Sequence, residues 1–471
     1  MGCFPSSPRN AQGVNRLYPD QITLTICKMI FDDNCLTRAE KDLVKDFPLP
    51  PEYIVRDQPY MRYQSDRVLN ERPIVEQPHG AGEEPPNEIE LHPLPPKFAT
   101  PAPIHLIGSS SLLTAAATFH QATSAFPGAL KRIPDGEPKP RDCFIAFQIA
   151  TFSQCPWVLQ PFALYKETGV HEKNGFEEEV QALRAEHGEK EIRLNGSGYD
   201  IAAIASYAEF CRARGQGVIR AGVKFQVSLP NPHDVVAFCI RPEHQATVEK
   251  AYEKEMIAVL KRIQKYIPSY DLAIQFDCPF AVAMLEEVFP AWWVPNDGSI
   301  SDDNKTEVLL AGLEERFHTM ASYVHEDVDL GYHICYGDYG HKHFIEPRNT
   351  TISVKLANLI HDSVYRRIDW MHIPVPIDRK DEAYYEPLNA LTPRKCGQTE
   401  LYLGLVHAYD IAGTLQRMAV ADRVLGGRCY GVATECGWGR MQQDEVYSTL
   451  DVMREAAGVL FDTNTDEGNV A

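Results

Sequence analysis

The chain has 471 residues, of which 44% are hydrophobic and 24% charged, a balance typical of a folded globular protein rather than a disordered chain. It carries 46 Lys and Arg against 65 Asp and Glu, a formal net charge of −19 without a local basic patch, which argues against binding nucleic acid. No apolar run approaches the roughly 20 residues that span a bilayer, and the first ten residues lack the apolar centre of a secretory signal, so we expect a cytosolic protein without a transmembrane segment.

The N-terminal segment combines an acylation pattern with a high proline content. Gly2, Cys3 and Ser6 fit the N-myristoylation pattern, and Cys3 is placed where a second acyl chain could attach, so a weak lipid anchor is one hypothesis. Residues 1–103 hold 16 of the 34 prolines, which interrupt both helices and sheets. We therefore predict an irregular arm over residues 1–103, with a helical stretch only at 21–46.

From residue 104 onward, short apolar runs alternate with longer amphipathic stretches. Eight runs are predicted to be strands: 104–108, 130–134, 223–229, 272–276, 331–336, 368–375, 400–406 and 428–433. The clearest helices are expected at 243–266, 305–326, 351–366, 411–425 and 444–461. This alternation predicts an α/β protein with a (β/α)8 TIM barrel over residues 104–462 and a flexible tail at 463–471. A doubly wound open sheet is the alternative.

One connection is too long for a simple crossover between strands. Residues 150–215 follow the second predicted strand and include a charged stretch at 172–193. Loops without secondary structure of their own are rarely this long in a compact domain. We therefore predict a helical insertion after strand 2.

Polar residues gather where the predicted strands end, which is where barrel enzymes place their chemistry. Ser109 follows the first predicted strand, Asp135 the second, Asp277 the fourth and His407 the seventh. Asp135, Asp277 and His407 are candidates for acid–base catalysis. Arg440, close to the end of the eighth strand, is a candidate for binding a substrate carboxylate.

A His-Ile-Cys motif in the fifth predicted strand suggests a metal site. Side chains two residues apart in a strand face the same way, so His333 and Cys335 can converge on one ion. Zinc suits this mixture of imidazole and thiolate, and Cys436 after the eighth strand is the third candidate ligand. The competing interpretation is a hydrogen-bonded core histidine with ordinary buried cysteines, as expected for most of the 12 cysteines.

Four strand-end motifs, taken in chain order, resemble those of the catalytic barrel of cobalamin-independent methionine synthase. They are HLIGS at 105–109, IQFD at 274–277, HICY at 333–336 and TECG at 434–437. On this resemblance, residues 104–462 are identified as a member of the uroporphyrinogen decarboxylase/methionine synthase-like superfamily. The resemblance implies zinc on His333, Cys335 and Cys436, a substrate amino group on Asp277, and a substrate carboxylate near Ser109.

The sequence also departs from the methionine synthases. Pro374 stands where their glutamate ligand is expected, Cys278 replaces a usual carboxylate, and their companion N-terminal barrel has no counterpart. The fourth ligand position is left open between His372, Asp338, His341, His343, a water and the substrate thiolate. We expect a zinc-dependent transferase of a methyl or other alkyl group from a small-molecule donor to a thiol, but not methionine synthesis from methylfolate.

Two other functions are compatible with the same sequence. A metal-free lyase or decarboxylase on this barrel would use Asp135, Asp277 or a histidine as acid and base. A non-catalytic zinc or ligand binder would keep the ligands without turnover. Stoichiometric zinc would distinguish the transferase from the lyase, and turnover with a thiol would distinguish it from the binder.

Overall fold

The computed structural model describes residues 102–141, 144–152, 155–159, 192–337, 343–392 and 399–459. Almost all of the predicted arm, with its helical stretch at 21–46 and the acylation pattern at Gly2 and Cys3, lies outside these residues. So do the central part of the predicted insertion and the tail at 463–471. The domain boundaries inferred from the sequence therefore stay predictions.

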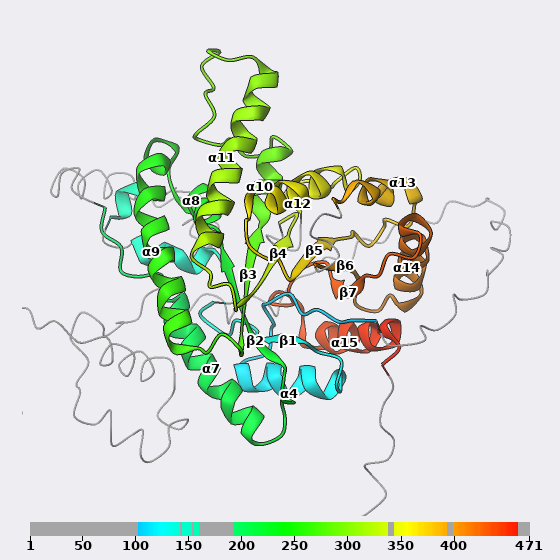
Figure 1. The fold of residues 1–471 in the computed structure, drawn as a ribbon. Coiled ribbons are helices and arrows are strands. Elements are labelled where there is room, and N and C mark those ends of the chain that lie inside the picture. The colour runs from blue at the N-terminus through cyan, green and yellow to red at the C-terminus, as the bar shows by residue number, and fades with distance from the viewer. Residues whose placement is uncertain are drawn as a thin grey trace, which may run out of the picture. The chain divides into compact units, whose positions relative to one another are not determined.

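The described residues form an α/β fold around a curled, fully parallel sheet (Figure 1). Its seven strands lie side by side in the order of the chain. They are β1 (Arg132–Pro134), β2 (Lys224–Pro230), β3 (Leu272–Cys278), β4 (Asp329–Ile334), β5 (Trp370–Pro374), β6 (Glu400–Val406) and β7 (Gly431–Thr434). The order never reverses, as it does in a doubly wound sheet, so that alternative is not found.

Helices connect the strands and surround the sheet (Figure 1). The α-helices are α4 (Ala115–Ala125), α7 (Tyr199–Gly215), α8 (Pro232–Cys239), α9 (Gln245–Tyr266), α10 (Pro279–Leu285), α11 (Asp302–Ser322), α12 (Thr351–Ser363), α13 (Glu382–Tyr385), α14 (Ile411–Leu425) and α15 (Gln443–Ala457). Short 3₁₀ helices are η2 (Ala146–Phe152), η3 (Pro156–Val158), η4 (Pro242–His244) and η5 (Glu386–Ala390). The last helix, α15, contacts the first, α4. None of the described helices is long and apolar enough to cross a membrane.

The helix α9 illustrates how the sequence pattern produces the fold. Its buried residues Val248, Tyr252, Met256, Val259 and Ile263 recur every three or four positions and form one stripe. All five are fully buried in the continuous hydrophobic core between the sheet and its helices. Burial of each such side chain stabilises the fold by about 1.5–3 kcal/mol.

The predicted first strand at 104–108 is wrong as a regular strand, and the closed eight-stranded barrel is not formed. Ile104 makes single parallel bridges to Leu130 on one side and to Val432 of β7 on the other. Farther along, the carbonyl oxygens of Leu106 and Ile107 accept hydrogen bonds from the side-chain amide of Gln226 at 3.0 and 2.9 Å. Side chains thus replace the backbone partners that would extend a ladder, and the sheet remains an open, curled sheet of seven strands.

The remaining predicted strands and the five clearest helices lie close to the observed elements, and α14 matches exactly in its bounds. Four of the described α-helices, α4, α8, α10 and α13, were not among those predicted. Of these, α8 and α10 each begin with a proline, Pro232 or Pro279, within two residues of the end of a strand, and proline is well suited to the first helical position. They bring the aromatic residues Phe238 and Phe280 to the same end of the sheet as the predicted site.

Candidate metal centre

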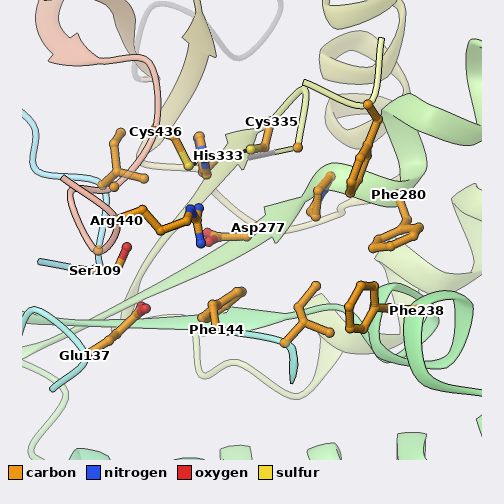
Figure 2. A pocket seen from close by; sticks show the side chains of 17 residues that line it. Ser109, Glu137, Phe144, Phe238, Asp277, Phe280, His333, Cys335, Cys436 and Arg440 are labelled. Carbon is orange, nitrogen blue, oxygen red and sulfur yellow. Dashed lines mark hydrogen bonds between the residues drawn. The ribbon is translucent and has the colours of Figure 1, made fainter. Parts of the chain in front are cut away.

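The three predicted ligands lie together at the carboxyl end of the sheet (Figure 2). His333 is in β4, Cys335 directly follows that strand, and Cys436 follows β7. One side-chain donor atom from each residue lies within 4.8 Å of the others, and the two sulfur atoms are 3.8 Å apart. The curl of the sheet brings together residues that are about a hundred positions apart in sequence.

The loop that carries Cys436 is fixed against the segment after residue 104. The amide of Trp438 donates to the carbonyl oxygen of Ser109 at 2.6 Å. Its indole N–H donates to the hydroxyl of Thr434, which itself donates to the carbonyl oxygen of Cys436. A Cβ atom on Gly437 would lie 2.3 Å from the Ser109 hydroxyl, so this close approach requires glycine.

The donor atoms of this cluster fit a zinc ion. His333 is 1% exposed, and its Nε2 atom is buried without a hydrogen-bond partner, an arrangement that is costly unless the lone pair has another use. Contact with Cys335 lowers the pKa of Cys436, and the same contact together with burial raises the pKa of Cys335. Two thiols and one imidazole are a donor set that zinc prefers.

His372, which the sequence left open as a fourth ligand, lies beside the cluster and uses both ring nitrogens elsewhere. Its Nδ1 is 2.7 Å from Nδ1 of His333, and its Nε2 is 3.1 Å from the carbonyl oxygen of Thr434. Burial, together with the neighbouring imidazoles of His333 and His105, lowers its pKa well below the ordinary value. The structure thus places His372 behind His333 rather than among the converging donor atoms. Two other candidates for the fourth ligand, Asp338 and His341, lie outside the described residues.

A pocket of about 100 Å³ opens directly against the cluster (Figure 2). Its polar residues include Ser109, Glu137, Asp277 and Arg440, together with the three candidate ligands. Its apolar residues include Phe144, Ile145, Phe238, Phe280 and Phe344. Figure 2 shows Arg440 extending into the same space as Asp277, with the aromatic rings on the other side. The pocket therefore joins a charged end to an apolar end.

Two carboxyl groups in this pocket are unusually basic. Burial raises the pKa of Glu137 to about 8, although Arg141 opposes the rise. Burial and the charge of Glu137 raise the pKa of Asp277 well above its ordinary value, although a hydrogen bond from Gln275 opposes it. Burial and the repulsion between Glu137 and Asp277 both disfavour two negative charges without a counter-charge. A cationic group between these carboxyls would therefore be stabilised.

Asp135, predicted as a catalytic residue, has a different place. One of its carboxylate oxygens accepts a hydrogen bond from the amide of Glu137 at 2.8 Å, and the other accepts one from Arg141 at 2.6 Å. Glu137 has a positive φ of 50° and follows Gly136, whose φ is 79°. Asp135 thus holds the turn that directs Glu137 into the pocket. The sequence alone does not show which of these two carboxyls faces the cavity.

A second pocket, of about 190 Å³, lies against the same two cysteines. It includes the predicted residue His407 together with His343 and Glu435. Burial lowers the pKa of His407, whose Nε2–H donates to the carbonyl oxygen of Val375 at 2.9 Å. The pKa of His343 is shifted in the opposite direction, to about 9. Burial alone would lower it, but the nearby carboxylates of Glu435 and Glu346 raise it by more.

Comparisons with known proteins gave matches among solved structures alone. No family model matches the sequence, and no curated protein matches it. The chain is similar to a vitamin-B12-independent methionine synthase from Listeria monocytogenes, described as putative, at 12% identity and a TM-score of 0.41; the match covers 74% of this chain and 87% of that one. It is also similar to a B12-independent methionine synthase from Shewanella at 14% identity and to a methyltransferase from Methanosarcina mazei at 12%.

The last two matches have TM-scores of 0.33, and each covers 55% of this chain and 66% or 64% of the other. Two of the three names agree with the family that the strand-end motifs resemble. At these TM-scores the likeness carries no argument about function.

Proposed function

We propose that this protein is an enzyme that transfers a methyl or other alkyl group from a small-molecule donor to the sulfur of a thiol, with zinc held by His333, Cys335 and Cys436. The observation that carries the proposal is that two separate pockets meet at Cys335 and Cys436. A group transfer needs two substrates that meet at one reaction centre, and two pockets that share these cysteines support this proposal.

Zinc bound to these residues would supply a Lewis acid that holds the acceptor sulfur as a thiolate at neutral pH. The chemical change is then the formation of a carbon–sulfur bond as the bond between the alkyl carbon and its donor atom breaks. The donor atom keeps the electron pair of the broken bond; a donor atom that would depart as an anion takes up a proton, whereas a sulfonium donor departs as a neutral thioether. Cys335, which is 6% exposed, and His333 are buried, and electrostatic effects are stronger in buried surroundings than in water.

The first pocket has the composition of a site for a zwitterionic thiol. Glu137 and Asp277 would accept hydrogen bonds from an amino group, which relieves the repulsion that raises both pKa values. Ser109 and Arg440 would bind a carboxylate on the same molecule. The phenylalanine side chains would exclude water from the sulfur.

The second pocket has groups suited to the alkyl donor. His343, with its pKa of about 9, is protonated at neutral pH and could donate a proton to the departing donor atom. His407 lines the same pocket and is neutral, so it would orient the donor by hydrogen bonding. Pro374 ends β5 without offering a ligand, in keeping with a donor more reactive than methylfolate.

Metal analysis of the purified full chain is the first test. We expect about one zinc per wild-type chain and loss of most of it in Cys335→Ser and in Cys436→Ser. Cys239→Ser is the matched control, because Cys239 is also buried but lies outside the cluster. The variants should remain folded, since the large hydrophobic core does not depend on a metal.

Turnover is the second test. Homocysteine and other small thiols would be incubated with methyltetrahydrofolate, with methyl sulfonium compounds and with other alkyl donors, and thioether formation would be measured. We expect a thioether from a donor other than methyltetrahydrofolate. Wild-type protein that is metal-free and releases carbon dioxide or another fragment without a thiol would favour the lyase, in which the basic carboxyls Glu137 and Asp277 act as acids. Stoichiometric zinc without turnover on any donor would favour the binder.

A further inference from the structure

A chain of hydrogen bonds ends on the candidate ligand His333. His333 in β4 and His372 in β5 are direct partners in the parallel ladder. Their Nδ1 atoms are 2.7 Å apart, and their ring centroids are 4.8 Å apart with the planes inclined by 47°. His372 is completely buried, and its other nitrogen, Nε2, is 3.1 Å from the carbonyl oxygen of Thr434 at the end of β7.

The carbonyl oxygen of Thr434 decides where the protons of the two rings lie. A carbonyl can only accept a hydrogen bond, so Nε2 of His372 must carry a proton and donate it. A neutral imidazole has a single N–H, and His372 is a buried ring whose hydrogen bonds go to another imidazole and to a carbonyl. Its Nδ1 is therefore bare and accepts.

The same reasoning carries one step further to His333. At 2.7 Å the contact between the two Nδ1 atoms is a hydrogen bond, so one of them must donate. Because Nδ1 of His372 accepts, Nδ1 of His333 carries the proton. An imidazole that binds a metal carries a single proton, so with Nδ1 protonated the ligand atom of His333 in its cluster with Cys335 and Cys436 is Nε2, which is buried and has no hydrogen-bond partner.

We propose that His372 is a positioning residue that fixes His333 in the tautomer with a free Nε2 lone pair directed at Cys335 and Cys436. This inference rests on the proposed metal site, and it assigns to His372 a role other than that of a fourth ligand. A partner on the second nitrogen is a common way to set the tautomer and orientation of a ligating histidine.

Thr434 couples this arrangement to the third ligand. Its carbonyl oxygen accepts from His372, while its hydroxyl donates to the carbonyl oxygen of Cys436 at 2.7 Å. One residue at the end of β7 therefore braces both His333, through His372, and the backbone of Cys436. This chain of hydrogen bonds from His333 through His372 and Thr434 to Cys436, called the relay below, joins β4, β5 and β7. It sets the relative position of two of the three ligands.

A pair of substitutions separates this role from ligation and from simple packing. In His372→Gln, the amide nitrogen can still donate to the Thr434 carbonyl and the amide oxygen can accept from Nδ1 of His333. In His372→Leu neither bond can form. His318→Gln is the control, because His318 bonds to a backbone carbonyl, that of Ser363, far from the cluster.

The first readout is zinc affinity, measured by competition with a chromogenic chelator. We expect His372→Leu to weaken zinc binding by about 10- to 100-fold, as is usual for the partner of a ligating histidine. His372→Gln should stay within a few-fold of wild type, and the control should not change. Equal loss in the Leu and Gln variants would mean that the imidazole itself is a ligand, and retention of affinity in the Leu variant would also overturn the proposal.

The second readout needs no metal. In chelator-treated wild-type protein with ¹⁵N-labelled histidine, the nitrogen resonances of His333 should show a protonated Nδ1 and a bare Nε2, with the same pattern in His372→Gln. A proton on Nε2 of His333 in wild type would overturn the relay. If wild type bound no zinc but showed the expected tautomer, the metal site would fail while the relay stood. These two measurements also decide the outcome if the Leu variant does not fold.

Discussion

The buried carboxyl of Glu137 makes a sharp prediction about stability and pH. Its pKa in the folded protein is about 8, raised by burial, against an ordinary value of 4.5. The folded state therefore keeps the proton over a range in which the unfolded state has lost it. It follows that the wild-type fold is destabilised as pH rises from about 4.5 to 8, and that the stability present at low pH is lost over this window.

The magnitude follows from the two pKa values. At about 1.4 kcal/mol for each pKa unit, the full penalty above pH 8 is about 5 kcal/mol, and it is about 1.4 kcal/mol at pH 5.5. Glu137→Gln removes this titration, and it also removes the charge that contributes to the raised pKa of Asp277, an effect that favours the variant at high pH in the same direction. Between pH 5.5 and 9, the stability of the variant relative to wild type should therefore increase by about 3 kcal/mol.

Urea unfolding of chelator-treated protein at pH 5.5 and 9 would measure this difference. Glu314→Gln is the control, since Glu314 is exposed on α11 and its substitution should have little effect at either pH. A stability difference between Glu137→Gln and wild type that is the same at both pH values would refute the reasoning. It would show that Glu137 ionises freely in the folded protein.

Three further predictions concern other parts of the fold. Gly136→Ala should lower the free energy of unfolding, measured in urea, by about 2–4 kcal/mol, because its φ is 79° and a Cβ atom would lie 2.4 Å from the hydroxyl of Thr118. Gly217→Ala is the control: its φ is similar, 76°, but a Cβ atom there has open space, so the loss should be only about 1 kcal/mol. Glu435→Gln should lower the pKa of His343 from about 9, which an NMR titration would detect, and an unchanged pKa would contradict the ion pair. Gln275→Leu should cost about 1–3 kcal/mol, because it removes the side-chain oxygen that accepts from the buried Nε2 of His105 at 2.9 Å and from the Trp370 indole N–H at 3.2 Å, and an unchanged stability in urea would mean that these donors find another partner.

The sequence predicted the elements that depend on local patterns. Apolar runs and helical stripes were sufficient for seven parallel strands and for helices such as α9 and α14, because periodicity reports directly which face is buried. The sequence wrongly predicted a regular strand at 104–108, because this segment has the apolar composition of a strand. Its carbonyl groups bond to Gln226 and Gln275, and such distant side-chain partners leave no periodic signal.

The candidate site was predicted to a similar degree. The spacing of His333 and Cys335 within one strand predicted their convergence, and the position of Cys436 after the last strand placed it at the same edge. The roles of neighbouring residues depended on directions that sequence cannot give. The turn at Gly136 directs Glu137 rather than Asp135 into the pocket, and the register of β4 and β5 places His372 behind His333.

The single bridges of Ile104 to Leu130 and to Val432 have a consequence for local opening of the fold. Strands β2 and β3 share a ladder of six residue pairs, whereas Ile104 is held to each neighbour by a single bridge. Local opening should therefore start at these single bridges, and the amide of His105, bonded to the Val432 carbonyl, should exchange with solvent hydrogen sooner than amides inside β3. Cys436 follows the strand on that side, while His333 lies in β4 across the sheet and Cys335 directly follows β4. An ion bound to all three residues would connect the loop after β7, beside the segment that opens, to β4. The exchange of the His105 amide should therefore slow when zinc is added.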